Sequence, residues 1–206
     1  ARYLTHDPSR EDVLSVFAGL RPLVSLSDGE ENTAAISRDH TLSLSRSGLL
    51  TIAGGKWTTY RKMAEDTVDQ AIHIAGLEPE RCETHNLNIH GHHFHAEKFG
   101  QLEMYGSDAP LLEKVIEEQP SYGEFLPGSA EIRAGQVVWA VREEMARTVE
   151  DFLSRRTRML LLDARSSIKA APAVAQLMAE ELGRGDDWAR EQVEQYTELA
   201  KGYLAA

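Results

Sequence analysis

The chain has 206 residues, of which 42% are hydrophobic and 27% are charged. These values are typical of a soluble globular protein with a sizeable core, arranged as one medium domain or two small ones. The net charge of −11 and the pI of about 5.2 argue against nucleic acid as the main partner, because phosphate binding needs a clustered positive field.

The ends of the chain and its cysteine content indicate where the protein works. No apolar run reaches about eighteen residues, and no charged region followed by an apolar one opens the chain. We therefore expect neither a membrane span nor a signal peptide. The chain begins at Ala1 rather than at a methionine, so we interpret it as a fragment. The single Cys82 cannot form an internal disulfide, which favours a reducing cytoplasm.

Strand patterns occur in the first part of the chain. One strand is predicted around Val13–Phe17. The alternating TLSLS (Thr41–Ser45) and the apolar LLTIA (Leu49–Ala53), joined by the turn-forming SRSG, predict a hairpin that ends at Gly54. Because a lone hairpin is marginal in water, we expect these strands to belong to a larger sheet whose other strands lie outside this chain.

From Thr58 onward the pattern is helical. Apolar residues recur at helical spacing as far as Ala75, and Gly76 is a stop signal. A polar connector follows. Five further helices are then predicted: one that begins after Ser107, one over 134–146, one that begins at a Thr148–Asp151 capping box, one over 173–182 and one that begins at Asp187. The expected fold is mainly α: a small N-terminal β part followed by a helical domain of about five to seven helices.

The segment IAGGKWTTYRKMAEDTVDQA (Ile52–Ala71) joins the hairpin to the first helix. Gly54 and Gly55 stand where the strand gives way to the helix, so no Cβ prevents a close approach. Free N–H groups and the positive end of the helix dipole meet there, which predicts contact with an anion or a cofactor edge. Taken alone, the segment is equally compatible with a strand–helix turn that binds nothing.

Four blocks of sequence follow one another in a familiar order. They are GLRPLV (19–24), ISRDH (36–40), AGGKWTTYRKMAEDTVD (53–69), and GEFLPGSAEI (123–132) with WAVREEMARTVEDFLSRRTRMLLLDARSS (139–167). In order and spacing they resemble the C-terminal part of FAD-dependent glycerol-3-phosphate dehydrogenases and oxidases. The resemblance covers nearly the whole chain, and the third and fourth blocks are highly specific.

The resemblance implies that the parent protein oxidises glycerol 3-phosphate to dihydroxyacetone phosphate by transferring hydride to flavin. It implies that residues 1–75 are the end of the FAD- and substrate-binding domain, and that 76–206 form a helical C-terminal domain. The helix start would face the pyrimidine edge of the flavin, lined by Gly54, Gly55, Lys56, Thr58 and Thr59.

Two arginines are the candidates for binding the substrate phosphate. The blocks that contain Arg21 and Arg38 resemble the family positions that hold this group, and Lys56 would assist. Guanidinium suits a dianionic ester because it is always charged and binds in bidentate fashion. The alternative is that all three residues are ordinary surface cations.

Parts of the family pattern are missing. No G-x-G-x-x-G follows a strand, so the fingerprint for the ADP half of FAD is absent, as are the family's upstream active-site residues. We therefore expect no catalytic residue in this chain, which alone should neither retain FAD nor turn over substrate. Two alternatives remain: a non-catalytic helical interaction or capping module, or the tail of a related FAD-dependent amine or amino-acid oxidase.

The resemblance also bears on the electron acceptor and the location. The family contains peripheral membrane enzymes that use quinone and soluble oxidases that use oxygen, so either is expected as acceptor. The expected location is cytoplasmic, with peripheral association of the parent at the inner face of the cytoplasmic membrane. Mitochondrial members carry calcium-binding loops near the C-terminus. The sequence lacks a D-x-[DN]-x-[DN]-G loop, which favours a bacterial source.

Four other groups of residues have simpler interpretations. The histidines of the connector could hold a metal, but their spacing matches no familiar site, so no metal is expected; they are His85, His90, His92, His93 and His95. RRTR (Arg155–Arg158) is predicted to be a helix junction paired with Glu143, Glu144, Glu150 and Asp151 rather than a patch that docks to anionic membrane. Trp139, Val141 and Met145 are predicted to pack in the core. The adjacent Ser37, Asp39 and His40 do not make a hydrolase triad.

Overall fold

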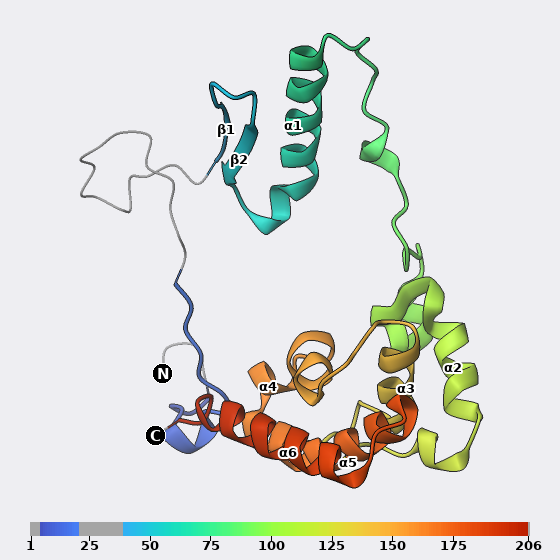
Figure 1. Ribbon diagram of the computed structural model, residues 1–206. Coiled ribbons are helices and arrows are strands. Elements are labelled where there is room, and N and C mark those ends of the chain that lie inside the picture. The colour runs from blue at the N-terminus through green and yellow to red at the C-terminus, as the bar shows by residue number, and fades with distance from the viewer. Residues whose placement is uncertain (1–4, 21–38, 206) are drawn as a thin grey trace. The chain divides into compact units, whose positions relative to one another are not determined.

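The computed structural model describes residues 5–20 and 39–205 (Figure 1). Within these ranges the protein is mainly α-helical, with one two-stranded antiparallel sheet near the N-terminal end, as expected. The chain divides into two compact units. One consists of Gly19–Ile89, and the other combines Ala1–Ala18 with His90–Ala206.

The sheet is the predicted hairpin. Strand β1 (His40–Leu44) pairs with β2 (Leu50–Gly54) in a register that runs from His40 opposite Gly54 to Leu44 opposite Leu50. Gly48 adopts φ +88° in the connecting turn, a conformation that favours glycine. The predicted hairpin is therefore confirmed, and β1 begins one residue earlier than expected.

The strand predicted around Val13–Phe17 is wrong. These residues form no strand and belong to the helical unit. The Val16 N–H donates to the Tyr203 carbonyl over 2.8 Å, and the Ser15 hydroxyl donates to the Leu160 carbonyl over 2.9 Å. An extended apolar segment can satisfy its backbone at helix ends as well as in a sheet, and sequence pattern alone does not distinguish the two.

Helix α1 (Tyr60–Ala75) follows a single 3-10 turn, Trp57–Thr59. The regular helix therefore begins two residues later than Thr58. It ends as predicted at Gly76, which adopts φ +63° while the Leu77 N–H donates to the Ile72 carbonyl over 3.1 Å. No residue of α1 is buried.

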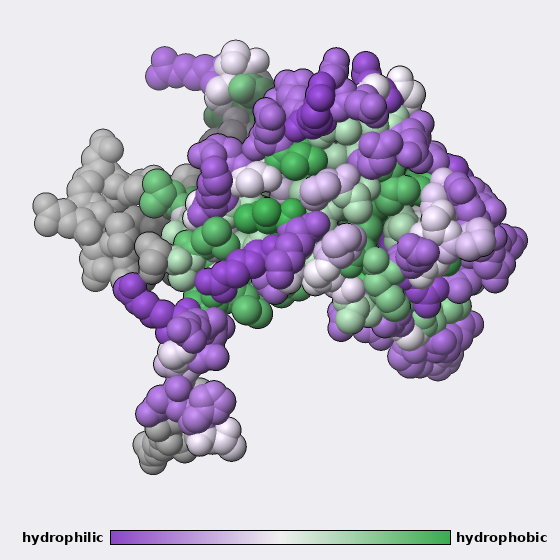
Figure 2. Space-filling model, turned by 90° about the horizontal axis from the view of Figure 1, so that it is seen from below, coloured by the Kyte–Doolittle hydropathy of each residue, from purple (hydrophilic) through white to green (hydrophobic). Residues whose placement is uncertain are grey.

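The helical unit contains two apolar clusters. Its helices are α2 (Ala109–Glu117), α3 (Ala134–Arg142), α4 (Met159–Leu162), α5 (Ala164–Leu182) and α6 (Asp186–Lys201), with 3-10 turns over Ala96–Asp108 and a π-helix over Asp151–Arg156. The larger cluster lies around Phe152, Leu160 and Met178, and the smaller around Leu112 and Trp139. On the face shown in Figure 2, apolar residues remain visible between hydrophilic ones.

Helix α3 is shorter than the pattern predicts. It ends at Arg142, and Met145 lies beyond it in a left-handed conformation with φ +56°. Trp139 and Val141 are buried as predicted, but Met145 is 76% exposed, so its assignment to the core is wrong. The apolar spacing continued past the point where the helix stops.

The RRTR segment is an ion-paired junction, as predicted. Arg155 pairs with Glu150 over 2.7 Å and with Asp151 over 3.1 Å, and Arg156 pairs with Glu144 over 3.4 Å. Glu143, the fourth expected partner, makes no ion pair within the described part of the chain. The predicted capping box is also confirmed, because Asp151 and Thr148 accept each other's backbone N–H groups over 3.0 and 3.1 Å.

Candidate functional site

The predicted flavin-facing residues lie together at one corner. Gly54 ends β2, Lys56 follows, and Thr58 and Thr59 form the turn that leads into α1. We call residues 54–59 the glycine corner. The two phosphate candidates, Arg21 and Arg38, lie outside the described residues, so their role stays a prediction.

The two glycines of the corner have backbone conformations that suit few other residues. Gly54 adopts φ +78° and Gly55 φ +77°. A Cβ on Gly55 would lie 2.4 Å from the Met63 sulfur and 3.4 Å from the His40 Cβ. Gly55 is therefore favoured by its left-handed conformation, whether or not a ligand is present, and the end of the Met63 side chain would have to move to admit a Cβ.

The turn after the glycines is closed by its own hydrogen bonds. The Thr59 hydroxyl donates to the Lys56 carbonyl over 3.0 Å and accepts the Lys56 N–H over 3.2 Å. The Thr59 N–H donates to the same carbonyl over 3.0 Å. The two threonines thus differ, because Thr59 is committed to the turn.

Other donors of the corner remain available. The Trp57 and Thr58 N–H groups and the Thr58 hydroxyl have no partner among the described residues, and both residues are exposed. Lys56 is exposed as well and makes no ion pair within residues 39–89. By contrast, Arg61 pairs with Glu65 over 2.9 Å and Lys62 with Asp66 over 2.8 Å. The corner therefore combines unpaired amides with one unpaired cation, a donor set that suits an anion or an electron-rich ring edge.

Sequence reasoning missed the contribution of His40 to this corner. His40 stands opposite Gly54 in the sheet, and its Nε2 lies 2.9 Å from Asp66 Oδ2 of α1. The hairpin predicted from TLSLS and LLTIA begins at Thr41, so it does not include His40. His40 belongs to the ISRDH block and stands beside Asp39, and neither pattern predicts a contact with α1.

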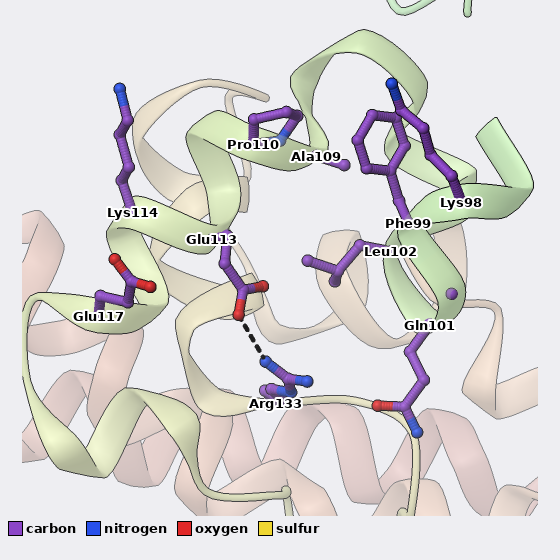
Figure 3. A pocket seen from close by; sticks show the side chains of 11 residues that line it. Lys98, Phe99, Gln101, Leu102, Ala109, Pro110, Glu113, Lys114, Glu117 and Arg133 are labelled. Atoms are coloured by element: carbon purple, nitrogen blue, oxygen red, sulfur yellow. Dashed lines mark hydrogen bonds and ion pairs between the residues drawn. The ribbon is translucent and has the colours of Figure 1, made fainter. Parts of the chain in front are cut away.

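Two cavities among the described residues lie away from the glycine corner. A groove of about 660 Å³ runs along α1 beside residues 80–89 and is lined in part by Val68, Ile72 and Leu87. In the helical unit, a cavity of about 680 Å³ opens between residues 98–102 and α2, with Arg133 bound to Glu113 over 3.3 Å at its edge (Figure 3). Neither is lined by a residue of the glycine corner.

The histidine-rich connector forms separate local contacts. His90 pairs with Asp108 over 2.6 Å and His95 with Glu97 over 3.3 Å. Among the described residues, no three His, Cys, Asp or Glu side chains are grouped closely enough to hold a metal ion. Nor does any helix in these ranges have the length and apolar character needed to cross a membrane.

Relatives with known names cover most of this chain. The probable mitochondrial glycerol-3-phosphate dehydrogenase of Dictyostelium discoideum is 33% identical over 95% of the chain and 33% of the relative. The probable mitochondrial glycerol-3-phosphate dehydrogenase of Caenorhabditis elegans is 34% identical over 93% of the chain and 30% of its own length. The mitochondrial glycerol-3-phosphate dehydrogenase of Mesocricetus auratus is 34% identical over 95% of the chain and 29% of its own length. The chain thus spans a third or less of these relatives.

The named relatives come from eukaryotes and are described as mitochondrial. They lend no support to the bacterial source expected from the missing calcium loop. The protein-family model for the C-terminal domain of alpha-glycerophosphate oxidase matches residues 46–192, a range that contains the whole glycine corner. The chain therefore belongs to the family of the C-terminal domain of alpha-glycerophosphate oxidase.

Proposed function

We propose that this chain is the C-terminal part of an FAD-dependent sn-glycerol-3-phosphate dehydrogenase. The observation that supports the proposal best is the family match over residues 46–192, because it includes the corner whose amides have no partner in the described chain. Since the chain spans only a third or less of its relatives, the activity would belong to a longer polypeptide, called the long form below.

The residues present fit one edge of a flavin. Gly54 and Gly55 place no side chain at the corner, and the Trp57 and Thr58 amides are free to donate. Thr58 is the better hydroxyl donor of the two threonines, since Thr59 already bonds to Lys56. Donors fixed in advance toward developing negative charge are an effective way to stabilise a reduced cofactor.

The substrate would be held by cations of the same unit. Arg21 and Arg38 would bind the phosphate of glycerol 3-phosphate, and Lys56 would contribute a further charge. A flavin held at the glycine corner would supply the hydride acceptor for oxidation of C2 of glycerol 3-phosphate to dihydroxyacetone phosphate, and the hydroxyl proton would leave to a base in the part of the long form outside this chain. The chain's own contribution is to orient the substrate and to supply fixed positive charge.

The helical part has a different role in this proposal. Residues 76–206 would cap and stabilise the FAD- and substrate-binding domain, whose end would lie within residues 1–75, although Ala1–Ala18 pack with the helical unit. The two apolar clusters of the helical unit support this role, because they provide a core without any residue of the corner. The same observation supports the second candidate function, a non-catalytic helical interaction or capping module.

The acceptor, quinone or oxygen, and a cytoplasmic location with peripheral membrane association belong to the proposal for the long form.

The test compares the 206-residue chain with the long form. Both are purified, mixed with FAD and dialysed, and flavin absorbance and acceptor-dependent oxidation of glycerol 3-phosphate are measured. We expect the chain to be colourless and the long form to be yellow and active.

The outcomes separate the candidates. A long form that binds flavin but ignores glycerol 3-phosphate would favour a related amine or amino-acid oxidase. A long form that binds no flavin would contradict the proposal and favour the non-catalytic module.

A further inference from the structure

His40 and Asp66 connect the hairpin to α1 next to the glycine corner. His40 is the first residue of β1 and pairs with Gly54 in the sheet. Its Nε2 lies 2.9 Å from Asp66 Oδ2, and the two side chains are only 21% and 30% exposed. The contact is therefore partly shielded from water, which makes it stronger than an ordinary surface pair.

Gly55 is enclosed by the same two elements. The position of its missing Cβ is 3.4 Å from His40 Cβ and 2.4 Å from the Met63 sulfur. Met63 and Asp66 are three residues apart on α1, so they share the face of the helix that meets the hairpin. The corner is thus held by the packing of Met63 and, beside it, by the His40–Asp66 hydrogen bond.

The Asp66 carboxylate is held in the ionised form that accepts this hydrogen bond. Its other oxygen, Oδ1, lies 2.8 Å from the Lys62 ammonium group. The hydrogen bond from Lys62 is the largest influence on the pKa of Asp66, which is lowered from its usual value despite partial desolvation, and His40 lowers it further. The carboxylate therefore stays ionised near neutral pH and accepts a hydrogen bond from His40 Nε2 when that nitrogen carries the hydrogen.

We propose that His40 is a positioning residue that, through Asp66, fixes the direction in which the Trp57 and Thr58 amides point. In this role His40 acts through Gly54 and Asp66, which is why we call it a positioning residue. The inference rests on the proposed function, because the direction of these amides matters only if they face a flavin. Hydrogen-bond donors must be held within a few tenths of an ångström of the productive position to be effective. A hydrogen bond that supports them should therefore affect function.

The first test uses the 206-residue chain. Amide hydrogen exchange is measured at Lys56 and Thr59, whose N–H groups are bonded within the turn. His40→Ala and Asp66→Ala should each raise exchange at both amides by roughly fivefold, the effect of losing one partly exposed hydrogen bond. His40→Gln should restore protection because it retains a donor. His73→Ala, a substitution of an exposed histidine on the same helix, should change nothing.

A second variant covers the case in which His40→Ala does not fold. His40→Leu keeps the packing volume but removes the donor, so it should raise exchange as the alanine variant does. Unchanged exchange at Lys56 and Thr59 in the folded His40 and Asp66 variants would overturn the inference, whatever the flavin content of the long form.

The second test separates positioning from stability in the FAD-loaded long form. His40→Ala should lower kcat about tenfold while the KM for glycerol 3-phosphate stays constant, because the phosphate contacts are untouched. A merely structural role would lower the yield of folded enzyme but not the turnover per bound flavin, and that result would overturn the inference. If the unsubstituted long form bound no FAD, the proposed function would fail while the exchange measurements still decided the role of His40.

Discussion

Two neighbouring threonines make different contributions at the glycine corner. The Thr59 hydroxyl both donates to and accepts from the Lys56 backbone, whereas the Thr58 hydroxyl has no partner among the described residues. A residue that closes a turn and a residue that faces a ligand should respond differently to substitution. The pair therefore offers a matched comparison within one turn.

We predict that the two alanine variants affect different properties, one the stability and the other the affinity for FAD. Thr59→Ala should lower the free energy of unfolding by about 1 kcal/mol, as expected for the loss of a capping side chain. Thr58→Ala should leave stability unchanged but weaken FAD binding by the long form roughly fivefold, since one hydrogen bond is lost. Urea unfolding and a flavin titration measure the two quantities. Equal effects of both substitutions on FAD affinity would contradict the assignment.

Gly106 is required for steric reasons in the helical unit. A Cβ at Gly106 would lie 1.8 Å from the Gly91 carbonyl oxygen, whereas nothing lies within 4 Å of a Cβ at Gly100. Both glycines have almost the same backbone conformation, with φ +52° and ψ −121° at Gly106 and φ +56° and ψ −123° at Gly100. The comparison thus isolates the clash from the backbone strain.

The corresponding variants should differ clearly in stability. Gly100→Ala should cost about 1–3 kcal/mol from strain alone. Gly106→Ala should cost at least about 2 kcal/mol more, because backbone atoms must move apart to relieve the overlap. Denaturant unfolding of both variants measures the difference. Equal costs would show that the crossing of the chain at Gly91 is not as close as described.

At the scale of elements, Arg142 links three helices of the helical unit. From α3, its Nη1 donates to Glu118 over 2.8 Å beyond the end of α2, and its Nε donates to Glu181 of α5 over 2.7 Å. The hydrogen bond from Arg142 lowers the pKa of Glu181 most strongly, against the opposing effect of burial. A carboxyl group whose folded pKa is lowered stabilises the fold above its unfolded pKa, and this contribution disappears as the pH falls through the folded value.

Arg142→Met should therefore destabilise the protein in a pH-dependent way. At pH 7 we expect a loss of about 1–2 kcal/mol, because the 35% exposure of the guanidinium lets solvent screen the pairs. The difference from the unsubstituted chain should shrink well below pH 4.5, the usual pKa of a glutamate. Unfolding free energies at several pH values test this. Arg190→Met, which removes a highly exposed pair with Asp187, is the control.

Element positions were predictable where local chemistry defines the ends. The end of the hairpin at Gly54, the end of α1 at Gly76 and the Thr148–Asp151 capping box all follow from turn and cap residues. The start of α5 was not predictable, because Pro172 suggests a helix start whereas the structure places it inside Ala164–Leu182. Asp163, which accepts the Ser166 N–H over 3.0 Å, is the actual cap, and burial of Val174 and Met178 outweighs the proline.

At the scale of the whole molecule, the resemblance to the family predicted more residues of the candidate site than hydrophobic periodicity did. The paired glycines and the helix start predict a ligand at the glycine corner, and only the family blocks favour that prediction over a turn that binds nothing. Two cavities of comparable volume among the described residues are not lined by the corner, so cavity volume would not have pointed to it. His40 was missed because its role depends on a contact between residues 26 positions apart. Long-range contacts of this kind are set by tertiary packing, and no local pattern encodes them.

The proposed phosphate site gives a prediction for the long form. Arg21→Ala should weaken binding of glycerol 3-phosphate by roughly 2–3 kcal/mol, the value of a charge-assisted contact, and should leave FAD affinity unchanged. Steady-state kinetics measure the change in KM. Arg46→Ala, in the hairpin turn of the same unit, is the control. An unchanged KM in the Arg21 variant would remove that residue from the site.

The most direct measurement is amide hydrogen exchange at Trp57 and Thr58 in the long form, with and without FAD. These two N–H groups have no protein partner in the described chain, so they should exchange rapidly without cofactor and become protected when FAD binds. Slow exchange with FAD, lost again when the flavin is removed, is the predicted result. FAD binding that leaves both amides exchanging freely would contradict the claim that the glycine corner faces the flavin.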